Sequence, residues 1–152
     1  MLPFASEARH NSVLMHLHAS CAARDGHGVL LLGPAGSGKS DLLLRLLAQD
    51  FTLVADDQVQ VQGGLASPPK ALAGLMEVRG LGIVRLPYTA SARLALAIEL
   101  GVGNRLPEPT RHAGTGLPLV WIDPAQPSAA ARVALALACA LGTVTQVAGA
   151  FA

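Results

Sequence analysis

The feature that most constrains this chain is the octapeptide GPAGSGKS, which comprises Gly33, Pro34, Ala35, Gly36, Ser37, Gly38, Lys39 and Ser40. Its glycines let the backbone turn so that several N–H groups point inward at one bound anion. A short apolar run, Gly28 to Leu32, precedes it, and leucines at helical spacing follow it. This order of strand, loop and helix predicts a phosphate-binding loop, with Lys39 on the terminal phosphates and Ser40 on Mg²⁺.

The rest of the sequence predicts one α/β domain. We expect strands at 12–19, 28–32, 52–55, 59–61, 94–100 and 117–122, and a last helix from 129 to about 141, capped by Ser128 and followed by a loose tail. Strand-like runs interrupted by glycines occupy 75–86, and 101–116 is expected to be a long loop. We therefore predict a single domain, 1–152, of the P-loop NTPase type with a central mixed sheet.

Composition narrows the function classes. The formal charge of +1 offers no attraction for a polyanion, so nucleic acid is not an expected partner. The longest apolar stretch, Ala129 to Leu141, is interrupted by Arg132 and is shorter than the roughly 20 residues of a membrane span, so no span is expected. Without a signal peptide we expect a cytoplasmic protein. Cys21 and Cys139 have no metal-ligand spacing and are expected to be buried hydrophobes.

Acidic residues follow the strand at 52–55 directly. P-loop proteins place a carboxylate there, near Mg²⁺ or the attacking group, and the doublet Asp56-Asp57 permits two roles. We expect Asp56 near the metal. Glu77 and Arg79 share a face if their segment is extended, either as ligand contacts or as an ion pair at a strand end.

Other charged side chains leave alternatives open. His16 and His18 share one face of the first expected strand, which suits a metal or acid/base pair but equally a solvated strand face. Arg105 and Arg111 in the long loop either stabilise charge on a transferring phosphoryl group or face solvent.

Taken together, His18, the segment GPAGSGKSDLLLRL, LVADDQV at 53–59 and EVRGLGI at 77–83 resemble the catalytic C-terminal domain of HPr kinase/phosphorylase. Members of that family use ATP and Mg²⁺ to phosphorylate a serine of HPr, the phosphocarrier protein of the sugar phosphotransferase system. Many members also remove that phosphate by phosphorolysis. The resemblance implies a P-loop α/β domain that forms a homo-oligomer, typically a hexamer, with HPr as its partner.

The resemblance also implies roles for individual residues. Lys39 would contact the phosphates, Ser40 and Glu77 would hold Mg²⁺, and Asp57 would take the serine proton. His18 stands at the family's active-site histidine, although Ala19 replaces the usual glycine after it, and Arg105, in Arg105-Leu106, matches a catalytic arginine. The arginine-rich loop that most members carry before the last helix is replaced here by PAQPSA at 124–129. By the resemblance we expect a short form of the family, which lacks the separate N-terminal domain.

Two other functions are consistent with a phosphate-binding loop. A small-molecule P-loop kinase normally adds an arginine-bearing lid helix, and nothing between Arg79 and Arg111 predicts one. A nucleotide-dependent switch of the GTPase kind would need an Asn-Lys-x-Asp segment to recognise guanine, which this sequence lacks.

Overall fold

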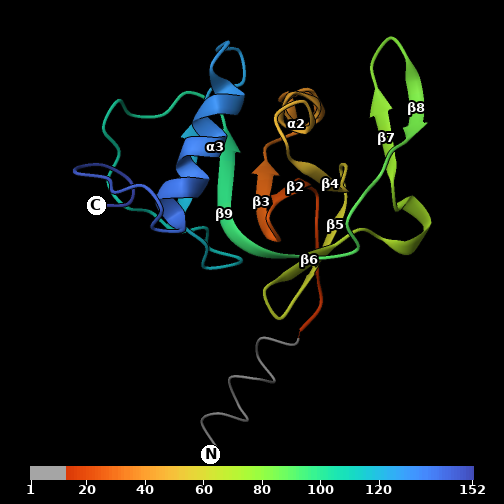
Figure 1. Cartoon of the computed structure of the whole chain (residues 1–152), viewed down its shortest axis with the longest axis horizontal. Helices are drawn as coiled ribbons and strands as arrows, with labels where there is room; N and C mark the ends of the chain where they lie inside the picture. Colours follow the sequence, from red (N-terminus) through yellow and green to blue (C-terminus); the bar gives the residue numbers. More distant parts are fainter. Residues whose placement is uncertain (1–12) are drawn as a thin grey trace, which may run out of the picture.

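A computed structural model describes residues 13–152 of the chain. Figure 1 shows the helices α2 and α3 lying against one strongly curved sheet, with a separate hairpin beside it. The elements are β1 (Met15–Leu17), β2 (Ser20–Arg24), β3 (His27–Leu32), α2 (Lys39–Leu47), β4 (Thr52–Ala55), β5 (Val59–Gln62), β6 (Leu65–Ser67), the 3₁₀ turn η1 (Lys70–Leu72), β7 (Leu75–Val78), β8 (Gly82–Arg85), β9 (Ala92–Leu100), β10 (Leu119–Ile122) and α3 (Ala129–Ala140).

The central sheet has eight strands and is mixed, as the sequence predicted. The strand order is β1-β5-β6-β9-β3-β2-β4, and β10 pairs with the C-terminal half of β9. The pairs β3 with β9 and β9 with β10 are parallel, and the others are antiparallel. Because β3 and β9 are parallel, their carboxyl ends meet at one edge of the sheet, and the loop 33–40 leaves β3 at that edge.

Both faces of the sheet are covered by apolar side chains. One group of these, the helix-side cluster, joins the sheet to α2 and α3. The other cluster lies on the opposite face, between β2, β3 and β4 and the curled strands β5 and β6. Strand β3 contributes to both, since Val29 and Leu31 face the helices while Leu30 and Leu32 face the second cluster. Double-sided burial explains why this strand is a continuous apolar run.

The N-terminal strands differ from the expected ones. The strand expected at 12–19 is limited to Met15–Leu17, with Ser12 outside the described residues, and a second strand, Ser20–Arg24, follows after a bend. Its first four residues, Ser20 to Ala23, are small, and none of its residues is β-branched, so propensity gave no indication of it. The Asp25-Gly26 turn into β3 has positive φ at both positions, 52° and 80°, which is the hairpin geometry that an Asp-Gly pair favours.

The segment 75–86 forms the antiparallel hairpin β7–β8, a two-stranded sheet apart from the main one. Figure 1 shows it standing to one side of α2. The hairpin is anchored to the helix-side cluster by Met76, which is fully buried there, and by Val78 of β7 and Val84 of β8, which pack against the cluster. The hairpin therefore shares its core with the main sheet but not its hydrogen bonding.

The C-terminal part matches the expected elements, with three differences in detail. Ser128 does precede α3, but its hydroxyl accepts a hydrogen bond from Arg132 Nε at 2.8 Å instead of capping a backbone amide. The tail is not entirely loose, because Ala150 is buried and Phe151 packs against the helix-side cluster. Cys139 is partly exposed, whereas Cys21 is fully buried. Within 13–152, neither helix has the length and apolar character to cross a bilayer.

Candidate active site

The loop 33–40 connects β3 to α2 as the sequence predicted. Gly33 has φ 153°, and a Cβ there would lie 2.6 Å from Ser37 Oγ, so only glycine fits this turn. Gly38 has φ 99° and immediately precedes the first residue of α2, Lys39. The left-handed backbone at this position turns the chain into the helix, whose N-terminal amides then face the inside of the loop.

Lys39 is held inside this loop. Its ammonium group donates hydrogen bonds to the carbonyl oxygens of Gly33 at 2.6 Å and Pro34 at 3.1 Å, and the side chain is 6% exposed. Ser37 Oγ is buried and has no hydrogen-bond partner among the described residues. The loop thus contains a fixed cation and a buried hydroxyl, both donors to phosphate oxygens.

Asp56 connects three elements through its carboxylate. Oδ1 accepts hydrogen bonds from the hydroxyl of Ser40 on α2 at 2.7 Å and from that of Ser20 on β2 at 3.2 Å. Oδ2 accepts one from the backbone amide of Glu77 on β7 at 3.2 Å. Asp56 therefore stands beside Ser40, the arrangement in which a P-loop protein shares Mg²⁺ between a hydroxyl and a carboxylate.

Asp57 has a different environment from its neighbour. Its Oδ1 accepts a hydrogen bond from His18 Nε2 at 2.6 Å, and both side chains are more than half exposed. Its backbone has φ 68°, which is uncommon for a residue with a side chain. In this conformation the consecutive carboxylates have different partners, which is compatible with the two roles that the sequence permits.

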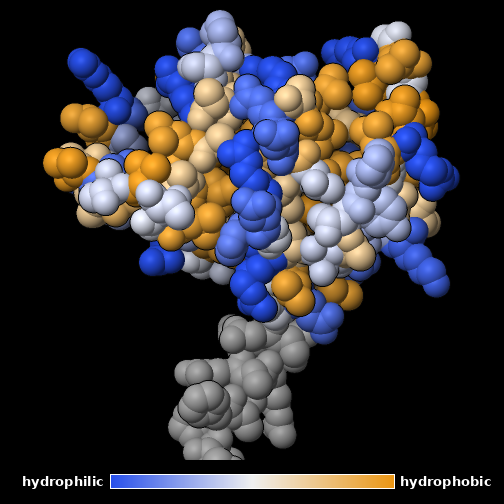
Figure 2. Space-filling model, in the orientation of Figure 1, coloured by the Kyte–Doolittle hydropathy of each residue, from blue (hydrophilic) through white to orange (hydrophobic). Residues whose placement is uncertain are grey.

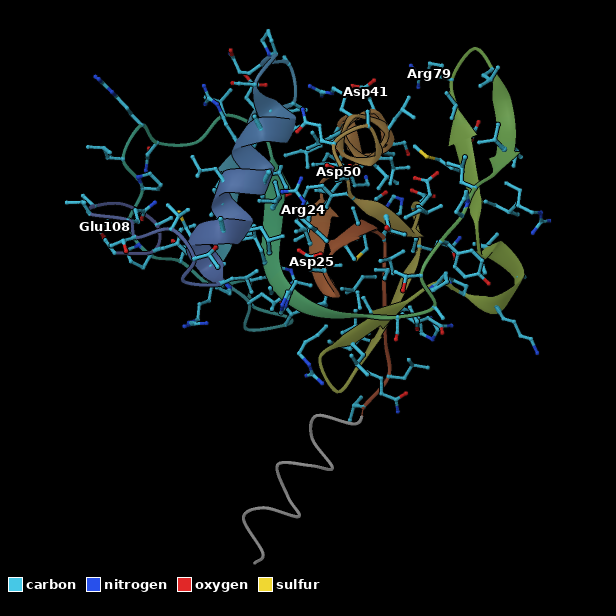
Figure 3. All side chains as sticks on the ribbon, in the orientation of Figure 1. Arg24, Asp25, Asp41, Asp50, Arg79 and Glu108 are labelled. Carbon is cyan, nitrogen blue, oxygen red and sulfur yellow. The ribbon has the colours of Figure 1, made fainter. Side chains whose placement is uncertain are left out.

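A cavity of about 490 Å³ brings the predicted residues together. It is lined by Ala35, Gly36, Gly38, Lys39, Ser40, Asp41, Leu44, Asp57, Met76, Glu77, Val78 and Arg79. Figure 3 shows Asp41 on α2 and Arg79 on the hairpin at the same end of the molecule, on the two sides of this cavity. The loop 33–40, α2 and Asp57 supply one wall, and β7 with Arg79 supplies the other.

The oxygen atoms of Ser40 and Glu77, which line this cavity, and of Asp56, which is hydrogen-bonded to Ser40, suit magnesium. Ser40 offers a hydroxyl, Asp56 and Glu77 offer carboxylates, and all three are hard donors of the kind that Mg²⁺ prefers. Residues 13–152 contain no group of three or more His, Cys, Asp and Glu side chains close enough to enclose a metal. This sparse donor set fits an ion that keeps several waters and takes its remaining ligands from substrate phosphates.

Some candidates lie away from the cavity. Arg105 is exposed in the loop after β9 and is absent from the cavity lining, so its assignment stays a prediction. Arg111 donates to the Gly116 carbonyl at 2.9 Å, within its own loop. His16 lines, together with His18, a smaller depression of about 290 Å³ on the other side of Asp57. Sequence reasoning missed Ser20, whose link to both aspartates depends on long-range strand pairing.

Comparison with known proteins assigns the family. Residues 9–94, more than half of the chain, match the model of the HPr Serine kinase C-terminal domain. The chain belongs to this family. HPr kinase/phosphorylase of Clostridium tetani (strain Massachusetts / E88) is 39% identical over 87 residues, which are 55% of this chain and 26% of that protein. The chain thus matches about a quarter of the length of that curated relative.

The fold of the HPr kinase C-terminal domain is also found among solved structures. The Hpr(Ser) kinase/phosphatase from Coxiella burnetii superposes with a TM-score of 0.62 at 23% sequence identity, covering 80% of this chain and 86% of that one. The matched family region contains His18, the loop 33–40, both aspartates and Glu77, and ends before Arg105. The geometry described above therefore falls within the part of the chain that defines the family.

Proposed function

We propose that this HPr kinase domain transfers the γ-phosphoryl group of ATP to a serine of HPr, with Mg²⁺ as the metal. The observation that carries the proposal is the position of Asp57. It lines the same cavity as Lys39 and Ser40, and its carboxylate is oriented by His18 at 2.6 Å. A carboxylate beside a phosphate-binding loop suits the abstraction of a proton from an acceptor hydroxyl.

Each group of residues would have a separate task in the reaction. The loop amides and Lys39 would hold the β- and γ-phosphates, and Mg²⁺, held by Ser40, Asp56 and Glu77, would offset the charge of the transferring group. Asp57 would take the proton of the acceptor serine as its oxygen bonds to phosphorus and the bond to the leaving ADP oxygen breaks. The hydrogen bond to His18 uses one oxygen of that carboxylate and fixes its orientation.

The competing functions have less support. Residues 79–111 are all described and contain strands and loops but no helix, so the arginine-bearing lid of a small-molecule kinase is not formed there. The switch hypothesis offers no role for Asp57, whose side chain bonds His18 and not a residue of the phosphate loop. The family supports the kinase assignment, as does the cavity.

The deciding experiment is direct. The purified chain is incubated with HPr, Mg²⁺ and ATP labelled in the γ-phosphate, and phosphoserine is measured on HPr. We expect labelled HPr with the chain and none with the Lys39→Met variant, because the ammonium that contacts the phosphates is removed. Labelled HPr must also be absent when its acceptor serine is replaced by alanine. No seryl phosphate with the unmodified chain would contradict the proposal.

The same mixture tests the reverse direction. After the kinase reaction, nucleotide is removed, inorganic phosphate is added, and the mass of HPr is followed. The chain has the sequence PAQPSA at 124–129 in place of the arginine-rich loop that the resemblance associates with dephosphorylation. We therefore expect phosphorylated HPr to persist, and its rapid conversion to the unmodified mass would contradict this expectation.

A further inference from the structure

Ser20 is a buried polar residue whose hydroxyl is hydrogen-bonded to both residues of the aspartate doublet. It is the first residue of β2 and is 0% exposed. Its hydroxyl donates to Asp56 Oδ1 at 3.2 Å and accepts the backbone N–H of Asp57 at 3.1 Å. A buried hydroxyl is costly unless paired, and this one is paired in both directions with the two residues that the site depends on.

Strand register places the hydroxyl there. Strand β2 lies between β3 and β4, and Cys21 pairs with Ala55, the last residue of β4. A register shift follows between Cys21 and Ala22, which pairs with Leu53. Ser20 therefore lies opposite the position directly after β4, where the doublet begins. The irregularity in the ladder aligns a side chain of one strand with the loop that leaves its neighbour.

The backbone of Asp57 needs such a partner. A non-glycine residue in the left-handed region is strained by roughly 1 kcal/mol or more and persists only where its surroundings fix it. At φ 68°, Asp57 is held on its exposed side by His18 and on its buried side by Ser20. Removing the buried acceptor would leave the amide unpaired and the conformation free to relax.

We propose that Ser20 is a positioning residue, which holds Asp56 on Ser40 and Asp57 toward the cavity through one hydroxyl. This role rests on the proposed kinase function. Ser20 itself is absent from the cavity lining, so it acts through the two carboxylates and not on the phosphates or the acceptor. Its chemical requirement is a hydroxyl that can donate and accept simultaneously.

Kinetics of three variants test the role. Ser20→Ala is expected to lower kcat for HPr about ten-fold or more, because small displacements of a reacting group have effects of this size. The KM for ATP is expected to change by roughly two-fold or less, because the loop 33–40 is unaltered. Ser20→Thr keeps the hydroxyl and is expected to restore most of the loss. Cys21→Ala, a matched truncation at a fully buried neighbour, is expected to leave kcat unchanged.

Hydrogen exchange provides a readout that does not depend on activity. The Asp57 amide is expected to be protected in the unmodified chain and in Ser20→Thr, and to exchange about ten-fold faster or more in Ser20→Ala. An inactive unmodified chain would contradict the kinase function but leave this measurement valid. The positioning role is overturned if Ser20→Ala keeps both kcat and Asp57 protection, or if Cys21→Ala causes equal losses.

Discussion

At the scale of single residues, the site consists of two consecutive carboxylates with different partners. Asp56 accepts hydrogen bonds from α2, β2 and β7, whereas Asp57 is half exposed and bonded to His18. The difference comes from one backbone angle, the positive φ of Asp57. The sequence predicted two roles, with Asp56 near the metal and, by the resemblance, Asp57 as the base; the fold gives the two carboxylates different partners, and the roles stay predictions.

Replacement of Asp57 by asparagine should separate chemistry from nucleotide binding. Asparagine tolerates the left-handed backbone but cannot take a proton, so kcat for transfer to HPr should fall by about 10² to 10⁴. Nucleotide affinity, measured by calorimetry, should be nearly unchanged. Asp50→Asn is the matched control, since Asp50 is exposed, lies outside the cavity lining and has φ 65°. Unchanged transfer in the Asp57 variant would contradict its assignment as the base.

The two cysteines should react differently. Burial raises the pKa of the Cys21 thiol from 9.0 to about 12, while Cys139 is partly exposed. A disulfide reagent at pH 8 should therefore label one thiol in the native chain and two after denaturation. The unfolded chain releases the Cys21 proton above pH 9.0 and the folded chain does not until about pH 12, so stability should decline across that window. Rapid labelling of both thiols in the native chain would contradict the buried position.

At the scale of elements, local patterns predicted most of the parts that position the phosphates. The strand before the loop, the helix after it and the strand before the doublet were all recognisable, because each is a short run with a clear period. Strand β2 was not, since its small residues are buried on both faces by partners distant in sequence. The hairpin β7–β8 was recognisable as strand-like, but its separation from the main sheet depends on pairing that no local pattern contains.

The helix after the loop owes its stability to one face. Leu46 is fully buried in the helix-side cluster, whereas Leu44 on the same helix is 40% exposed. Leu46→Ala should lower the free energy of unfolding by about 2–5 kcal/mol. Leu44→Ala should cost about 1 kcal/mol or less, because much of its side chain already meets water. Urea titration followed by circular dichroism measures both, and equal losses would contradict the assigned faces.

At the scale of the whole molecule, β9 connects the two apolar clusters. An irregularity in its pairing with β3 near Ala95 changes which face its side chains take, so that Leu94 packs in one cluster and Leu96 in the other. Because β9 contributes side chains to both clusters, unfolding of the strands of one cluster would expose the other cluster to water. The sequence predicted a single domain, and the shared strand gives the physical reason to expect it to unfold as one unit.

Equilibrium unfolding should accordingly show one transition. Circular dichroism reports the helices and strands, and fluorescence reports Trp121, the single tryptophan, on β10. The two curves in urea should coincide, with the same midpoint. Non-coincident curves would mean that one apolar cluster survives without the other.

The distribution of polar and apolar side chains on the surface is relevant to the expected homo-oligomer. Figure 2 shows a hydrophilic band over the middle of one face, where Figure 3 labels Arg24 and Asp50, with apolar surface on either side. The hairpin adds Leu81 and Ile83, which are 74% and 72% exposed. Large exposed apolar areas favour association, in keeping with the homo-oligomer implied by the resemblance. Light scattering should give a mass several times 15.5 kDa, and a monomer at micromolar concentration would contradict that expectation.

The two walls of the cavity should differ in local stability, because one of them is the hairpin β7–β8. One wall consists of α2, the loop that precedes it and Asp57, and the other, which carries Glu77, belongs to a ribbon of two strands. Local opening of the ribbon would break fewer contacts than global unfolding, so the carboxylate of Glu77, the proposed magnesium ligand, should leave the site many times for each time the domain unfolds. We expect Met76, the buried side chain of β7, to limit these excursions together with Val78 and Val84, which pack against the same cluster. A substitution of Met76, which carries no charge and is not a proposed metal ligand, should therefore be measured as a weakened affinity for magnesium.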